Sequence, residues 1–186
     1  MYKRQSPDDL VRNYGCDSLR MYELFVGPPE LDAEWDDRGI DGVNRFLKRL
    51  WNLLIDSKEN EVQATKEMIK QRHRMVADIT MRLESFSLNT VISGFMEYNN
   101  KFIEIAKKEG GIDKETLETI AVLLSPFAPH FAEEMWEQLG HTETIFKAGW
   151  PTYDEAQMKD DEIEVPVQIN GKTKAVISIA ADLSLI

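Results

Sequence analysis

The residues best suited to chemistry in this 186-residue sequence are cations in a row, and their spacing indicates binding rather than catalysis. They recur at intervals of one to three residues, together with one neutral amide, and the four residues are called the basic row below: Arg45, Lys48, Arg49 and Asn52. At the period of a helix these positions share one face, and guanidinium and ammonium groups commonly contact phosphates. A solvated helix face usually carries acidic residues that form ion pairs with its cations, but the sequence has none between Asp41 and Asp56. The basic row predicts a surface for a polyanion, and an ordinary solvated face is the alternative.

A second set of cations lies further along the chain. Lys66, Lys70 and Arg74 recur at four-residue spacing, so we expect them to supplement the basic row as contacts for the same polyanion. Arg72 instead falls within the apolar sector of the same predicted helix. It is either buried and paired with a carboxylate, or its stem covers the core while its head reaches solvent. We prefer the second interpretation.

The sequence contains no recognisable catalytic constellation, so we predict no catalytic, cofactor-binding or metal-binding residue in it. His130 and Glu134 resemble a zinc-binding helix only superficially, because a zinc motif needs a further histidine. A glycine-rich phosphate loop and a dinucleotide-binding fingerprint are absent from the sequence. Cys16 is its one cysteine, which excludes a disulfide within this sequence and a multi-cysteine zinc site.

The net charge of −11 would argue against nucleic-acid binding if the charge were evenly spread along the chain. It is not evenly spread. Residues 43–82 hold nine Lys or Arg against five Asp or Glu, whereas residues 109–164 hold three against fourteen. Because exposed charges more than about 10 Å apart are largely screened at physiological salt, a local basic surface can still bind a polyanion. The sequence also lacks the run of about 18 apolar residues that a membrane span needs, and its first residues do not form a signal peptide. We therefore expect a cytoplasmic protein with no membrane partner.

A helix must present the basic row, and the strongest helical pattern in the sequence covers it. Between Asp41 and about Leu54 the apolar residues follow one helical stripe, and the basic row lies opposite that stripe. Similar patterns, caps and glycine or proline breaks predict further helices at about 7–14, 17–25, 61–83, 87–109, 113–124 and 131–139. Short connections between amphipathic helices favour a mainly α fold, an antiparallel helical bundle.

The pattern changes after the acidic residues 154–164, which we interpret as a solvated linker. Val165, Val167 and Ile169 alternate with other residues, Asn170-Gly171 is a preferred two-residue turn, and residues 172–179 alternate again. This predicts a β-hairpin. A hairpin alone is marginally stable, so we expect it to begin an incomplete small α+β domain.

Three segments carry a family resemblance. Residues 14–20 (Tyr-Gly-Cys-Asp-Ser-Leu-Arg) resemble the Tyr-Gly-Ala-Asp-x-Leu-Arg segment of class I aminoacyl-tRNA synthetases for leucine, isoleucine and valine. Residues 45–51 (Arg-Phe-Leu-Lys-Arg-Leu-Trp) and 125–130 (Ser-Pro-Phe-Ala-Pro-His), continuing to Trp136, resemble the first and last landmarks of the anticodon-binding helical bundle of that group. Together the three segments are fairly specific to this group of synthetases.

The resemblance to the leucyl-tRNA synthetase family, of bacterial type, depends on three further segments. These are Gly-Pro-Pro-Glu at 27–30 with Trp35 downstream, Trp-Pro at 150–151, and above all Val-Gln-Ile-Asn-Gly-Lys at 167–172. The last is similar to the opening of the C-terminal domain of the bacterial leucyl enzymes. The resemblance covers about residues 6–182.

The resemblance implies a domain organisation and a role. Residues 1–29 would be connecting helices at the tail of a catalytic region, 30–153 the anticodon-binding-type bundle, 154–164 a linker, and 165–186 the truncated start of a C-terminal tRNA-binding domain. The chain would dock leucine tRNA beside an upstream catalytic region that uses ATP with Mg²⁺, and it would be monomeric. The basic row with Lys66, Lys70 and Arg74 would then be RNA-binding, although these residues follow from helical geometry and not from the family motif.

The departures from the family limit what this segment can do. The Lys-Met-Ser-Lys-Ser loop that the family places just ahead of Ser6 is replaced here by Met-Tyr-Lys-Arg-Gln, and the His-Ile-Gly-His motif is absent. We therefore expect no leucine activation and no editing by this segment alone. Two alternatives stay open: a non-enzymatic helical scaffold that binds proteins through residues 109–164, or the same module from an isoleucyl-, valyl- or methionyl-tRNA synthetase.

Overall fold

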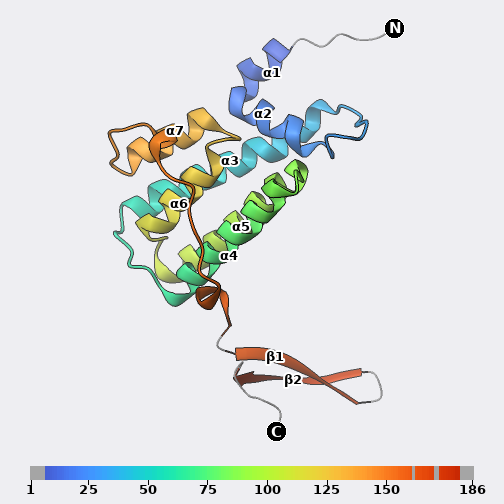
Figure 1. Ribbon diagram of the computed structural model, residues 1–186, viewed down its shortest axis with the longest axis vertical. Coiled ribbons are helices and arrows are strands. Elements are labelled where there is room, and N and C mark those ends of the chain that lie inside the picture. Colours follow the sequence, from blue (N-terminus) through green and yellow to red (C-terminus); the bar gives the residue numbers. More distant parts are fainter. Residues whose placement is uncertain (1–6, 161, 170–171, 181–186) are drawn as a thin grey trace.

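The computed structural model describes residues 7–160, 162–169 and 172–180, and in these residues helices are followed by two strands (Figure 1). The helices are α1 (Pro7–Tyr14), α2 (Cys16–Phe25), α3 (Ile40–Lys58), α4 (Lys66–Glu84), α5 (Leu88–Glu109), α6 (Lys114–Leu124) and α7 (Pro129–Gln138). Short 3-10 turns lie at η1 (Asp37–Gly39), η2 (Ile145–Lys147) and η3 (Glu155–Met158). The prediction of a mainly helical fold is confirmed.

Local chemistry sets the ends of the helices. The Thr65 hydroxyl accepts a hydrogen bond from the Met68 amide at 3.3 Å and caps α4, so the predicted start near Glu61 is wrong by about a turn. Asp113 caps α6 as expected, with its carboxylate 3.0 Å from the Thr116 amide. Gly110 ends α5 in the left-handed conformation, with φ of 84°, which glycine adopts without steric cost.

The apolar stripes of the helices meet in one core. Val43 and Leu54 of α3, Ile79 of α4 and Phe102 of α5 are fully buried there. The connecting helix α2 joins the same core through Leu19, Met21 and Tyr22. Burial of these side chains supplies most of the stability of the bundle, at about 25 cal/mol per Å² of apolar surface.

Close contact between α4 and α5, which lie side by side in Figure 1, depends on a glycine. A Cβ atom at Gly94 would lie 2.8 Å from Nη1 of Arg82 and 3.1 Å from Cδ1 of Ile79. The Arg82 guanidinium uses this space to donate to the Thr90 carbonyl at 2.6 Å while pairing with Asp78 on its own helix. Gly94 therefore allows the two helices to approach.

The strands β1 (Glu162–Ile169) and β2 (Lys172–Ala180) pair antiparallel, with Glu162 opposite Ala180 and Ile169 opposite Lys172. The register shifts between Val167 and Gln168, as at a β-bulge. The predicted turn at Asn170-Gly171 lies outside the described residues. The assignment of the strands to an incomplete α+β domain, and the predicted domain boundaries, stay predictions.

The chain between α7 and β1 is exposed at most of residues 154–160, as predicted for a solvated segment, but it is also hydrogen-bonded to α4. The Trp150 indole N–H donates to the Thr80 hydroxyl at 2.9 Å, and the Asp154 amide donates to Nδ1 of His73 at 3.1 Å. The turn η3 packs on α4 as well. The physical reason is that α4 offers polar and cationic partners for this acidic segment.

Candidate nucleic-acid interface

The structure places the basic row on the outward face of α3. Arg45, Lys48, Arg49 and Asn52 are all exposed, and the buried residues Phe46, Leu47 and Leu50 lie between them along the chain. This confirms the helical geometry on which the prediction depended. Within the described part of the chain, we find no hydrogen bond or ion pair made by any of the four side chains. Their donors remain available to an anion in solution.

The basic row forms a ridge between two hollows. On the side of α2 and α7, a hollow of about 550 Å³ is lined by Lys48, Asn52, Trp51 and Phe131, among others. On the side of α5, a hollow of about 370 Å³ is lined by Arg49, Asn52, Ile103 and Lys107, among others. The basic row therefore lies between two depressions of the surface.

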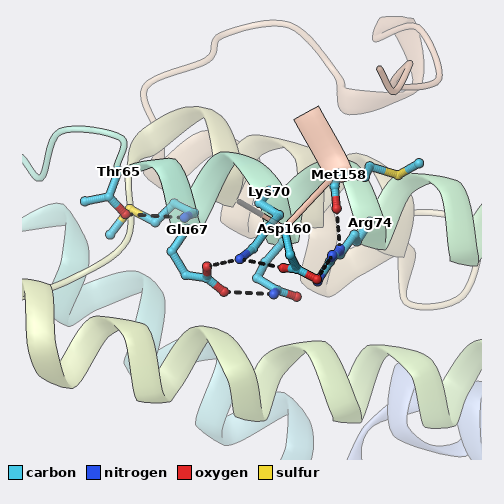
Figure 2. A network of polar contacts seen from close by, with 8 residues as sticks. Thr65, Glu67, Lys70, Arg74, Met158 and Asp160 are labelled. Atoms are coloured by element: carbon cyan, nitrogen blue, oxygen red, sulfur yellow. Dashed lines mark hydrogen bonds and ion pairs between the residues drawn. The ribbon is translucent and has the colours of Figure 1, made fainter. Parts of the chain in front are cut away.

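The cations of α4 have a different environment. Lys66 is exposed, but Lys70 pairs with Glu67 at 2.5 Å and with Asp160 at 3.1 Å. Arg74 donates to the Met158 carbonyl and to the Asp160 carboxylate, both at 2.8 Å, as Figure 2 shows. Lys70 and Arg74 are therefore neutralised by their own chain, and the structure does not bring them together with the basic row as unpaired cations.

The ion pairs on α4 are charged at neutral pH. Hydrogen bonds from Arg74 and then Lys70 hold the pKa of Asp160 below its ordinary value of 3.8. The hydrogen bond to Glu67 raises the pKa of Lys70, and that with Asp160 adds to the effect. The network in Figure 2 is thus an ionic contact between α4 and the segment that follows η3.

Arg72 is buried and paired, so our preferred interpretation of it was wrong. Its residue is only 7% exposed, and its guanidinium lies 3.4 Å from Asp113 and 2.9 Å from Glu115. The reason is that the cap of α6 places a carboxylate directly against α4. Arg72 therefore joins α4 to α6, with its guanidinium buried between the two helices.

Sequence reasoning missed a second contact between distant elements. His130 was considered only as a metal ligand, yet its Nδ1 lies 2.9 Å from the carboxylate of Asp17, which also accepts from the Phe131 amide at 2.7 Å. Asp17 is thereby held against the start of α7. No sequence signal pairs residues 113 positions apart, although the lack of a capping side chain at Ala128 left α7 in need of one. Groups of three or more metal-ligating side chains do not occur among the described residues.

No helix in the described part of the chain is long and apolar enough to cross a membrane.

Comparison with known proteins shows the family of this chain. Residues 65–186 match the family described as "Anticodon-binding domain of tRNA ligase". The leucine–tRNA ligase of Fervidobacterium nodosum is 45% identical over 96% of this chain, and that of Phocaeicola vulgatus is 42% identical over 98%. The chain spans 24% and 19% of the length of these two relatives.

A solved structure agrees with the sequence relatives. The crystal structure of the ternary complex of the Agrobacterium radiobacter K84 LeuRS with tRNA and LeuAMS superposes with a TM-score of 0.82. The match covers 97% of this chain and 25% of that one, at 26% identity. On these grounds the chain belongs to the anticodon-binding domain family of tRNA ligases.

Proposed function

We propose that this chain is the tRNA-docking part of a leucine–tRNA ligase and that the basic row contacts the phosphates of the tRNA. The single observation that carries the proposal is the exposed row of cations on α3, whose side chains have no partner among the described residues. Phosphate contacts supply affinity and position the nucleic acid, whereas base contacts specify sequence. We therefore expect docking through the backbone rather than reading of the anticodon bases.

The choice of leucine is supported by the two relatives described above, which are leucine–tRNA ligases at 45% and 42% identity. Because the chain spans about a quarter or less of their length, the ATP- and Mg²⁺-dependent joining of leucine to tRNA would belong to an upstream catalytic region. That region would be the protein partner of this chain.

Charge reversal on α3 tests the proposal. Arg45→Glu together with Arg49→Glu should weaken binding of leucine tRNA to this chain at least about tenfold at low salt, because two attractive phosphate contacts become repulsive. Both side chains are exposed, so the fold should be retained. Binding is measured by filter retention or fluorescence anisotropy, and the fold by circular dichroism.

The matched control is Lys101→Glu with Lys114→Glu, which changes the net charge by the same amount on exposed positions of α5 and α6. This control should weaken binding much less. Equal losses in the two double variants would mean that only net charge matters and would overturn the basic row as the docking surface. Absence of measurable tRNA binding by the parent chain would instead favour the protein-binding scaffold.

A further inference from the structure

Residues 150–160, which follow the helical bundle, are attached to α4 at four points. Trp150 bonds to Thr80, Asp154 to His73, Met158 to Arg74, and Asp160 to Arg74 and Lys70. As the chain advances from 150 to 160, its partners step back along α4 from Thr80 to Lys70. The segment therefore lies lengthwise and antiparallel along the helix.

Of these four points of contact, only the last, at Asp160, joins side chains of opposite charge. The side chains of Lys70, Arg74 and Asp160 are 21%, 32% and 46% exposed, so the ions are partly shielded from water. Both oxygens of the Asp160 carboxylate are used, one by each cation. A carboxylate held by two cations is fixed more firmly than one in a single surface ion pair, which contributes about 0–1 kcal/mol.

We propose that Lys70 and Arg74 are positioning residues: with Asp160 they form a clasp that fixes the path of the chain immediately before β1. We call these three residues the Asp160 clasp. Strand β1 begins at Glu162, two residues after Asp160, so little chain is left between the fixed point and the strand pair. The clasp thereby sets where the strand pair starts relative to the helical bundle.

This role goes beyond the proposed RNA docking. It assigns Lys70 and Arg74 to a contact within the chain rather than to RNA. Arg74 donates one hydrogen bond to the Met158 carbonyl and another to Asp160, and Lys70 lies between Glu67 and Asp160 (Figure 2). A phosphate at either cation would have to compete with the Asp160 carboxylate for its positive charge. The basic row of α3 carries no such internal partner in the described residues.

A distance measurement tests the clasp without any RNA. Cys16 is the one cysteine and is exposed, so a spin label there and a second on Thr173→Cys report the distance from the bundle to β2. The otherwise unaltered chain should give a narrow distribution of distances. Asp160→Asn and Arg74→Met should each broaden it, because each removes the ion pair between Arg74 and Asp160.

Hydrogen exchange supplies a second measurement on the unlabelled chain. In Asp160→Asn the amide of Asp154, which donates to His73, should exchange on the order of tenfold faster, since the segment opens more often once its end is released. The helical core should unfold at an unchanged temperature. Glu155→Gln, which alters an exposed carboxylate of the same segment, is the matched control and should change neither measurement.

Two results would overturn the clasp. One is a broad distance distribution in the chain with Asp160 intact, and the other is an equally narrow distribution after Asp160→Asn. Either result leaves the charge-reversal experiment on α3 unaffected, so failure of the clasp and failure of RNA docking are distinguishable.

Discussion

At the scale of single residues, Arg72 shows how this bundle accommodates a buried charge. Its partner Asp113 also caps α6, with one oxygen 3.0 Å from the Thr116 amide and the other 2.6 Å from the Thr116 hydroxyl. The exposed Glu115 supplies a second carboxylate to the guanidinium. One aspartate therefore satisfies both a helix end and a buried cation.

This double role predicts a graded response at position 113. Asp113→Ala should lower the free energy of unfolding by about 3 kcal/mol, because it removes the cap and leaves Arg72 with Glu115 alone. Asp113→Asn keeps a capping oxygen and should cost about half as much. Urea denaturation followed by circular dichroism measures both, and equal losses in the two variants would show that only one of the two roles matters.

Tyr98 predicts a dependence of stability on alkaline pH. Burial, aided by the charge of Asp78, raises the pKa of Tyr98 to about 12 from its ordinary 10.0. The folded state therefore favours the neutral phenol. The contribution of Tyr98 to the free energy of unfolding is fully present below pH 10 and is lost as the pH rises through about 12. The free energy of unfolding falls by roughly 2–3 kcal/mol over this range.

The comparison that isolates this effect is Tyr98→Phe, measured by urea denaturation at pH 9 and pH 11.5. The variant should lose less stability than the parent between these values, because it has no phenol to ionise. Tyr153→Phe, at an exposed position, is the control and should behave as the parent does. An identical loss in Tyr98→Phe and the parent would rule out this group as the cause.

At the scale of elements, α7 depends on a cap from another helix. Its own N-cap residue, Ala128, offers no side-chain hydrogen bond, and the Asp17 carboxylate of α2 accepts from the Phe131 amide instead. Tyr14 and Cys16, beside this contact, also line the larger hollow next to the basic row. The connecting helices thus help to shape the surface around α3.

Removing this distant cap should loosen α7. Asp17→Ala should cost about 1–2 kcal/mol of stability and speed hydrogen exchange in the first turn of α7, since the amide of Phe131 loses its acceptor. Asp32→Ala, in the exposed loop before η1, is the control. Unchanged exchange at Phe131 in Asp17→Ala would show that the contact does not support the helix.

The elements themselves were largely predictable from the sequence because helical periodicity and caps are local signals. The stripe that includes Val43, Phe46 and Leu50 predicted α3 and, with it, the outward face that carries the basic row. Gly110 and Asp113 marked helix ends correctly. The start of α4 was missed because the loop before Thr65 contains residues that also suit a helix.

Pairings between distant residues could not be predicted in the same way. The sequence shows that Arg72 lies on an apolar face, but not that Asp113 packs against it 41 positions later. It likewise shows acidic residues around 154–160 and cations on α4, but not that the segment folds back to pair them. Such contacts depend on tertiary packing, which no local spacing encodes.

At the scale of the whole molecule, the cations divide into two groups with different partners. Lys70 and Arg74 of α4 hold the chain's own acidic segment, whereas Arg45, Lys48 and Arg49 of α3 face solvent. An acidic protein with a net charge of −11 can therefore offer one local surface to a polyanion. In the proposed function, α3 is that surface.

The salt dependence of tRNA binding tests this claim most directly, because its slope counts phosphate contacts. The logarithm of the association constant should fall linearly with the logarithm of salt concentration, by about 0.7–0.9 for each contact. Arg45→Ala with Arg49→Ala should reduce the slope by about 1.4–1.8, whereas Lys101→Ala with Lys114→Ala should leave it nearly unchanged. A slope in the α3 variant equal to that of the parent would contradict docking of tRNA phosphates on α3.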